Sequence, residues 1–301
     1  MAFERTAEDV FPERRLSRRK GLAFVLSWAR QHVLHSLGIT MTALVIFVAL
    51  LAPLISPHDP TLQDSKIRLS PPAWSEEGSA EFPLGADNLG RDLLSRIFYG
   101  ARVSLIVGIC AVLLAGLFGV VLGLLSGYLE GRFETLIMGI ADAQLAFPSV
   151  LLAIAIIAIL GPSFGNVLLV LTISGWVIFA RLVRGTTLSV KQTDFILASR
   201  SVGAPDFRII FRHILPHVVT PVIAVANIQV GQMILAESAL SFLGLGVQPP
   251  TPTWGGMISD GRVYIWQAPW LSIFPGMAIV FTVLGITYLG DWLRIVLDPK
   301  Y

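Results

Sequence analysis

The side chains that could do chemistry in this chain are few, and their spacing favours no catalytic centre. Five histidines lie at positions 32, 35, 58, 213 and 217, and none has neighbouring cysteines that would complete a metal site. His213 and His217 are four residues apart, but Pro216 lies between them. The single cysteine, Cys110, excludes an intramolecular disulfide. We therefore expect no metal ligands and no catalytic residues.

A phosphate-binding loop is also missing from the sequence. The pattern G-x-x-x-x-G-K-[ST] occurs nowhere, and none of the four lysines follows a glycine. If ATP drives this protein, another chain must bind it, and we expect no cofactor on this one. The basic run ERRLSRRK at 13–20 is interpreted as a contact with anionic lipid that also sets the topology, not as a nucleic-acid site.

Two acidic residues lie in otherwise apolar stretches, where an ionisable group is a functional candidate by default. Asp142 lies about two turns from the cytosolic end of its stretch, where water or a partner can reach it. Glu237 closes a later stretch near the outer face. Their roles stay open at this point, and a proton relay at Asp142 is one alternative.

The densest group of polar residues is the segment GAPDFRIIFRHILP, 203–216. Asp194 favours the start of a short helix that Gly203 would end with a left-handed residue. Pro205 suits the first turn of a second helix, which Pro216 would stop. That second helix has apolar residues at 207, 210, 211, 214 and 215 and a polar side formed by Asp206, Arg208, Arg212 and His213.

These polar residues must be positioned by elements that cross a membrane. Hydrophobic residues make up 54% of the 301 and charged residues 14%, against roughly 25% charged in soluble domains. Six stretches are each about as long as the roughly 20 residues that a spanning helix needs. They are 37–56, 103–128, 135–160, 163–180, 218–236 and 271–290. The sequence predicts an all-α integral membrane protein with six transmembrane helices, the first an anchor and not a cleaved signal.

Lysine and arginine set the orientation of these helices. One side holds 16 of the 22 basic residues, so the positive-inside rule places both termini and the 181–217 loop in the cytoplasm. Amphipathic helices can simply lie at the lipid interface. A glycine hinge between two of them favours docking onto a cytoplasmic partner instead.

Three regions follow along the chain. Residues 1–36 form a basic cytoplasmic segment with a short interfacial helix at 21–36, and residues 37–101 form the first transmembrane helix and an ordered extracytoplasmic loop. Residues 102–301 form the main transmembrane domain with the loop 191–216. Its first helix carries small residues at a strict spacing of four, which predicts close packing against another helix of the same chain. They are Ala111, Ala115, Gly119, Gly123 and Gly127.

Several of these motifs resemble a known family. ILASRSVGAPDFRIIFRHILP (196–216) is similar to the EAA loop of ABC importer permeases, which forms the coupling helices that dock on a cytosolic ATPase. PLGADNLGRDLLSRIFYGARVSL (83–105), ADAQLAFPSVLLAIAIIAILGPSFGNV (141–167), ESALSFLGLGVQPPTPTWGGM (237–257) and LGDWLRIVLDPK (289–300) resemble the C-type permease of the dipeptide, oligopeptide and nickel group. The resemblance covers the chain from about residue 21 and implies a type I importer permease fold.

The loop departs from the family pattern at one position, where Leu197 replaces the acidic residue. Gly203 matches. The ATPase-docking role that the resemblance implies falls on Ala198, Ser199, Arg200, Gly203, Ala204, Asp206, Arg208 and Arg212.

The resemblance implies a permease subunit of a bacterial inner-membrane importer. Its expected partners are a homologous permease, two cytosolic ATPase subunits that bind ATP and Mg²⁺, an extracytoplasmic substrate-binding protein and membrane lipid. Its expected solute is a di- or oligopeptide, with nickel chelates, glutathione, opines and sugars as alternatives. An ion-gradient-driven carrier, which Asp142 would support, and a non-transporting membrane scaffold remain alternatives from other classes. The path could be lined by polar residues in the spans: Gln144, Asn166, Thr172, Ser174, Asn227, Gln229 and Gln232.

Overall fold

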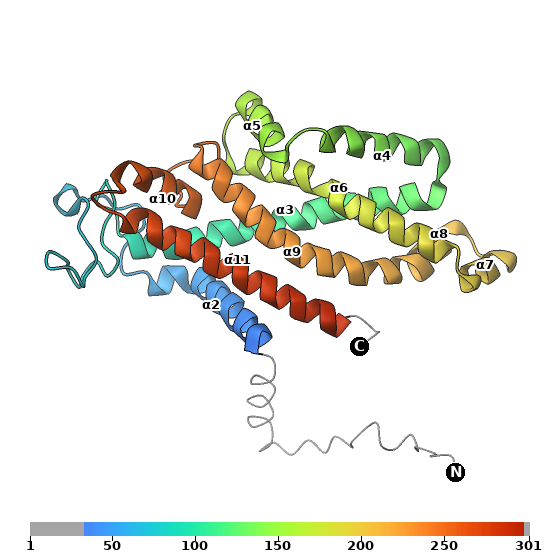
Figure 1. Ribbon diagram of the computed structural model, residues 1–301, viewed down its shortest axis with the longest axis horizontal. Helices are drawn as coiled ribbons and strands as arrows, with labels where there is room; N and C mark the ends of the chain where they lie inside the picture. Colours follow the sequence, from blue (N-terminus) through green and yellow to red (C-terminus); the bar gives the residue numbers. More distant parts are fainter. Residues whose placement is uncertain (1–32, 298–301) are drawn as a thin grey trace, which may run out of the picture.

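The computed structural model describes residues 33–297 and shows an elongated bundle of helices, with no strand in this part of the chain (Figure 1). Five helices are long and apolar enough to cross a membrane. They are α2 (Val33–Ile55), α3 (Leu93–Leu129), α6 (Phe164–Lys191), α9 (Leu215–Phe242) and α11 (Trp270–Leu297). A bent pair, α4 (Gly131–Leu145) and α5 (Ser149–Leu160), supplies a sixth apolar segment. The all-α fold is as predicted.

The third span is not the single helix over 135–160 that the sequence predicts. Its chain bends by 91° between α4 and α5. Pro148 explains the break, because a proline disfavours helical backbone in the residue before it. α4 ends at Leu145, and Pro148 becomes the N-cap of α5. Twelve residues in α5 rise only about 18 Å, too little to cross a hydrocarbon core of about 30 Å alone.

Two helices extend well beyond their apolar stretches. α3 starts ten residues before the predicted 103, because Asp92 caps it by accepting a hydrogen bond from the Ser95 N–H. α6 continues to Lys191, so Arg181 and Arg184 lie on a helix and not in the expected 181–217 loop. Residues 181–191 contain no proline that would end the helix, and α6 therefore extends beyond its apolar part through a segment with charged side chains.

The small residues of α3 pack against α6 of the same chain. Ala111 and Ala115 are fully buried. A Cβ atom on Gly123 would lie 2.6 Å from the Ala180 carbonyl oxygen, and one on Gly127 would lie 2.8 Å from Thr187 Cβ. Gly119 is equally close to α6. The stripe therefore brings two helix backbones together, as small residues do in membrane proteins.

The fifth span is longer than predicted, because Pro216 does not end the preceding helix. α8 (Asp206–Arg208), a π-helical segment η3 (Ile209–Ile214) and α9 form one apolar helical stretch from Asp206 to Phe242. In the π segment the Leu215 N–H bonds to the Ile210 carbonyl, five residues back. This wider turn lets the chain pass a proline that lacks an N–H for the α-helical pattern.

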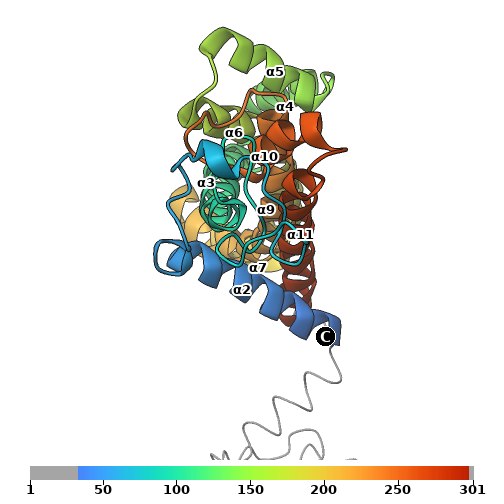
Figure 2. The ribbon, with the colours of Figure 1, turned by 90° about the vertical axis from the view of Figure 1, so that its left-hand side faces the viewer.

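The two ends of the bundle differ (Figure 1). One end carries residues 56–92, with a short helix η2 (Ser65–Ile67), and α10 (Trp254–Gly261). The other carries α7 (Asp194–Ser201) and α8. Seen end-on, α2 and α5 lie on opposite sides of the bundle (Figure 2). The basic segment and most of the interfacial helix expected at 21–36 lie outside the described residues, and residues 33–36 belong to α2.

Candidate coupling surface and translocation hollow

A sharp bend joins α7 to α8 at the cytoplasmic end of the bundle, and we call residues 194–214 the elbow. Gly203 has φ of +77°, the left-handed conformation that its sequence position predicts. Its N–H bonds to the Arg200 carbonyl at 2.9 Å, and the Ala204 N–H bonds to the Ser199 carbonyl at 3.1 Å. This pair of bonds is the Schellman arrangement that terminates a helix. Pro205 then starts the next helix as its N-cap.

Three isoleucines fix the elbow to the spans. Ile196 of α7 and Ile209 and Ile214 of the π segment are fully buried. They pack in one cluster with Val183 of α6 and Leu124 of α3. The elbow is therefore seated on the ends of α3 and α6.

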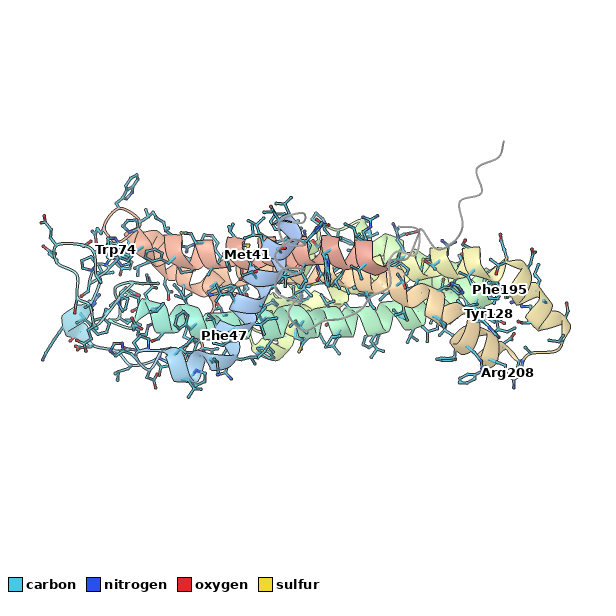
Figure 3. The ribbon with its side chains drawn as sticks, turned by 90° about the horizontal axis from the view of Figure 1, so that it is seen from below. Met41, Phe47, Trp74, Tyr128, Phe195 and Arg208 are labelled. Carbon is cyan, nitrogen blue, oxygen red and sulfur yellow. The ribbon has the colours of Figure 1, made fainter. Side chains whose placement is uncertain are left out.

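Tyr128, at the end of α3, organises the charges on the inner side of the elbow (Figure 3). Its hydroxyl bonds to the Asp206 carboxylate, and the Arg200 guanidinium lies over its ring at 5.3 Å from the centroid. Lys191 also lies over this ring and bonds to the Glu130 carboxylate at 2.8 Å. That ammonium lowers the pKa of Glu130 below its usual value.

Two of the predicted docking residues take part in these contacts. Arg200 and Asp206 are exposed, yet both engage Tyr128 of their own chain. Arg208 and Arg212 are also exposed, and they form no ion pair among the residues that the structure describes. The docking role of all four residues stays a prediction. Of the remaining predicted docking residues, Ala198 and Gly203 are exposed, and Ser199 and Ala204 are half-buried.

The elbow also exposes an apolar patch, which the sequence reasoning missed. Val202 is 84% exposed, Phe207 71% and Phe211 52%. Leu197, which replaces the family's acidic residue, is also exposed. The predicted apolar face of the second helix is thus divided. Ile214 is buried against the bundle, whereas Phe207 and Phe211 are exposed and their tilted rings contact each other, with centroids 4.4 Å apart. An exposed apolar patch of this kind marks an interaction site.

A hollow of about 440 Å³ lies between α5, α6 and α9. Most of its lining is apolar, with Ser149, Ser174, Gln229 and Gln232 as the polar exceptions. The Ser174 hydroxyl has no hydrogen-bond partner within the described residues. An apolar hollow with a few unengaged polar groups is suited to a small solute.

The other polar residues proposed for the path are engaged in hydrogen bonds within the chain. Asn227 donates to the Ile286 carbonyl at 2.6 Å, joining α9 to α11. Gln144 joins α4 to α6 through the Trp176 indole and the Ile173 carbonyl. Asn166 and Thr172 bond to carbonyls close to them in the chain. Of the seven polar residues suggested by sequence, Ser174, Gln229 and Gln232 line the hollow.

The two acids within apolar stretches have different surroundings. Asp142 forms an ion pair with Arg181 of α6, and both side chains are about half exposed. Glu237 is fully buried and accepts a hydrogen bond from the Ser241 hydroxyl at 2.6 Å, with the Ser104 hydroxyl of α3 at 3.5 Å. Asp142 is thus paired with a cation, whereas Glu237 joins α9 to α3 through hydroxyl groups.

Comparison with known proteins identifies the class to which this fold and these surfaces belong. Residues 119–301 match the model for the inner membrane component of binding-protein-dependent transport systems. Because that match spans more than half of the chain, the chain belongs to this family of ABC transporter permeases, whose members are multi-pass inner-membrane subunits and are not themselves catalytic. Residues 30–72 match the N-terminal transmembrane domain of oligopeptide transport permease C.

Individual relatives refine this assignment. The chain is 44% identical over 263 residues to the di/tripeptide transport system permease protein DppC of Pseudomonas aeruginosa, covering 87% of each. It is 45% identical over 271 residues to the glutathione transport system permease protein GsiD of Pectobacterium atrosepticum, covering 90% of this chain and 88% of the relative. An inward-facing structure of the MetNI methionine ABC transporter has the same fold, with a TM-score of 0.57 and 18% identity over 67% of this chain and 96% of the solved one.

Proposed function

We propose that this chain pairs with a homologous permease, and that the two form the path for di- or oligopeptides delivered by an extracytoplasmic binding protein. Two cytosolic ATPase subunits, which hold the ATP and Mg²⁺, dock on the elbow. As they close, they move the elbow and the spans rock between inward-open and outward-open states.

The observation that carries this proposal is the continuity of the helical stretch from Asp206 to Phe242. Phe207 lies on the exposed outer surface of the elbow, and Gln229 lines the hollow on the same stretch. Their separation of 22 positions corresponds to roughly 33 Å of helix. A displacement at the elbow is therefore transmitted along one continuous helical stretch to the polar groups of the hollow.

The amide and hydroxyl groups of the hollow support a peptide as the solute. Gln229, Gln232 and Ser174 can donate and accept hydrogen bonds, as the backbone of a short peptide requires. The relatives whose names mention di/tripeptides and glutathione point to the same chemistry. Nickel chelates, opines and sugars are the other solutes to be tested.

Docking is tested by purifying the tagged complex from its native membrane. We expect the double variant Phe207→Asp/Phe211→Asp to lose the ATPase subunits, because it places two carboxylates in the apolar patch. Val263→Asp is the matched control, since Val263 is 73% exposed but follows α10 at the opposite end. If the double variant retains its ATPase subunits as the control does, the elbow is not the docking surface.

Solute recognition is tested separately by transport. We expect Gln232→Ala to raise the KM for dipeptide uptake while the ATPase subunits still co-purify. Uptake that stops when the proton gradient is collapsed, with ATP retained, would instead favour an ion-gradient-driven carrier. Partner binding with no flux of any solute would favour a membrane scaffold.

A further inference from the structure

α3 contacts the elbow without being joined to it along the chain. Only two residues separate the end of α6 at Lys191 from Asp194, where the elbow begins, and the elbow continues directly into α9 at Leu215. α3 instead ends at Leu129 and is followed by α4. Side chains at the end of α3 therefore decide how firmly this helix is held to the elbow.

Tyr128 makes the polar contact between α3 and the elbow. The residue is only 5% exposed, and its ring belongs to the apolar cluster that contains Ile196 and Ile209. Its hydroxyl donates to the Asp206 carboxylate, and hydrogen bonds to an ionised group are among the stronger ones in proteins. Asp206 lies in the first turn of α8, yet no side chain caps that helix. Its carboxylate is therefore used for the contact with α3.

Two cations hold the Tyr128 ring in place. Arg200 of α7 lies 5.3 Å from its centroid and Lys191 of α6 lies 5.2 Å from it, as cations do over aromatic faces. The Lys191 ammonium also donates to the Tyr128 carbonyl at 2.5 Å. Phenylalanine at position 128 would keep the ring and lose only the hydroxyl bond to Asp206.

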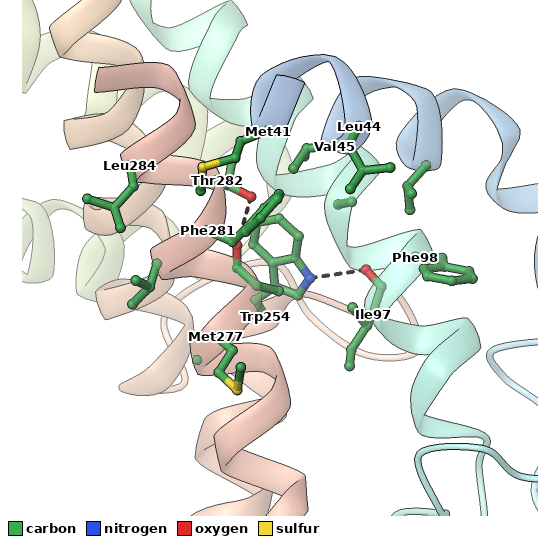
Figure 4. Close-up of a pocket in the computed structure, with 15 residues that line it drawn as sticks. Met41, Leu44, Val45, Ile97, Phe98, Trp254, Met277, Phe281, Thr282 and Leu284 are labelled. Carbon is green, nitrogen blue, oxygen red and sulfur yellow. Dashed lines mark hydrogen bonds between the residues drawn. The ribbon is translucent and has the colours of Figure 1, made fainter. Parts of the chain in front are cut away.

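The opposite end of α3 is held by a different ring. Trp254 of α10 is buried, and its indole N–H donates to the Ile97 carbonyl of α3 at 3.0 Å (Figure 4). A Cβ atom on Gly100 would lie 2.9 Å from Trp254 Cδ1, so the two helices are in close contact here. α3 is thus attached to α10 at its outer end and to the elbow at its inner end.

Between these two ends, α3 packs behind the lining of the hollow. Ala111 and Ala115 belong to one apolar cluster with Leu171 and Met233, two of the residues that line the hollow. A Cβ atom on Gly175, another lining residue, would lie 3.1 Å from Ala115 Cβ. A change in the tilt of α3 would therefore move part of the wall of the hollow.

We propose that Tyr128 is a positioning residue for transport, whose hydroxyl holds α3 on the elbow through Asp206. Movement of the elbow then reaches the hollow through α3 as well as through α9. This inference rests on the proposed function. Loss of the hydroxyl should leave docking intact, because Tyr128 is buried and lies outside the exposed patch of Phe207 and Phe211. It should reduce the amount of solute moved for each ATP hydrolysed.

The contact itself is tested by hydrogen exchange of the full-length chain. We expect Tyr128→Phe to speed exchange of the amides from Gly203 to Ile209 about fivefold, which corresponds to ~1 kcal/mol for one hydrogen bond. Tyr99→Phe is the matched control, because it removes a hydroxyl from the outer end of the same helix and its ring also carries a cation, Arg102. Wild-type exchange in Tyr128→Phe would overturn the contact.

The positioning role is tested by solute uptake per ATP hydrolysed, measured with the purified complex in proteoliposomes. We expect Tyr128→Phe to retain its ATPase subunits but to lower this ratio by up to about fivefold, for loss of the same bond. Tyr99→Phe should behave as the wild type does. The double variant Tyr128→Phe/Asp206→Ala should lower the ratio no further than Asp206→Ala alone, because both changes break one bond.

Two results would overturn the positioning role of Tyr128. One is wild-type coupling in Tyr128→Phe, and the other is a double variant in which the two losses multiply, which would assign them to separate contacts. Either result leaves the proposed function standing as long as the ATPase subunits co-purify with the wild-type chain. A wild-type complex without ATPase subunits would refute the proposed function, and this inference with it.

Discussion

Replacing Gly203 with valine tests whether the shape of the elbow couples ATP use to transport. The backbone of Gly203 has φ of +77°, and a Cβ atom there would meet no neighbour within 4 Å. The substitution therefore acts through backbone conformation alone and leaves the packing around it unchanged. A left-handed conformation costs an L-residue about 1–2 kcal/mol, which lowers the population of the bent elbow about 5- to 30-fold.

The assay is solute uptake per ATP hydrolysed, measured with the complex in proteoliposomes. We expect the ratio to fall in the order glycine, asparagine, alanine, valine, because asparagine tolerates the left-handed region and β-branched residues do not. Gly244→Val is the matched control, since Gly244 also has positive φ of +78° and an open Cβ position but lies after α9 at the outer end. A Gly203→Val complex with wild-type coupling would refute the reasoning.

Three further variants test the packing and charge contacts. Gly123→Leu should abolish recovery of folded chain from the membrane, because its side chain would collide with the α6 backbone, whereas Gly116→Ala should be recovered normally, since its Cβ comes no closer than 3.8 Å to Phe179. Glu237→Leu should lower Tm more than Glu237→Gln, because only glutamine can still bond to the hydroxyls of Ser104 and Ser241. Each buried hydroxyl left without a partner costs ~1–3 kcal/mol. Equal decreases in Tm for the two variants would contradict this. Glu130→Gln should lower Tm at neutral pH, because it removes the carboxylate that pairs with Lys191. The difference in Tm from wild type should disappear as the pH falls through the lowered pKa of Glu130, where the carboxylate is protonated and the pairing is lost. A difference that persists at acid pH would contradict a role for the Glu130–Lys191 pair.

The spanning segments could be predicted because lipid requires long apolar helices, but their ends could not. Hydropathy detects only the part of a helix that lies in the membrane. It therefore missed the ten residues from Leu93 onward and the last turns of α6 to Lys191. The bend at Pro148 was visible as a proline, yet its 91° angle depends on how α5 packs against α6.

The candidate site was predictable where it depends on local backbone and not where it depends on distant contacts. Gly203 and Pro205 have the roles that their local pattern indicates. Tyr128 and Asp206 lie 78 positions apart, and no periodicity indicates that they meet. Helical spacing placed Phe207 on the same apolar face as Ile214, but it did not tell which of them would face the bundle.

The π-helical segment Ile209–Ile214 joins the elbow to the fifth span and fixes the direction in which Phe207 points. The number of residues in this segment is therefore constrained. In an α-helix each residue turns the chain by about 100°. Deleting one residue here would restore α-helical bonding but rotate Phe207 to another side of the bundle. The outer segment 56–92 consists mostly of loops, which tolerate an added or deleted residue. Insertions and deletions during evolution should therefore accumulate in segment 56–92 and be eliminated from the π segment.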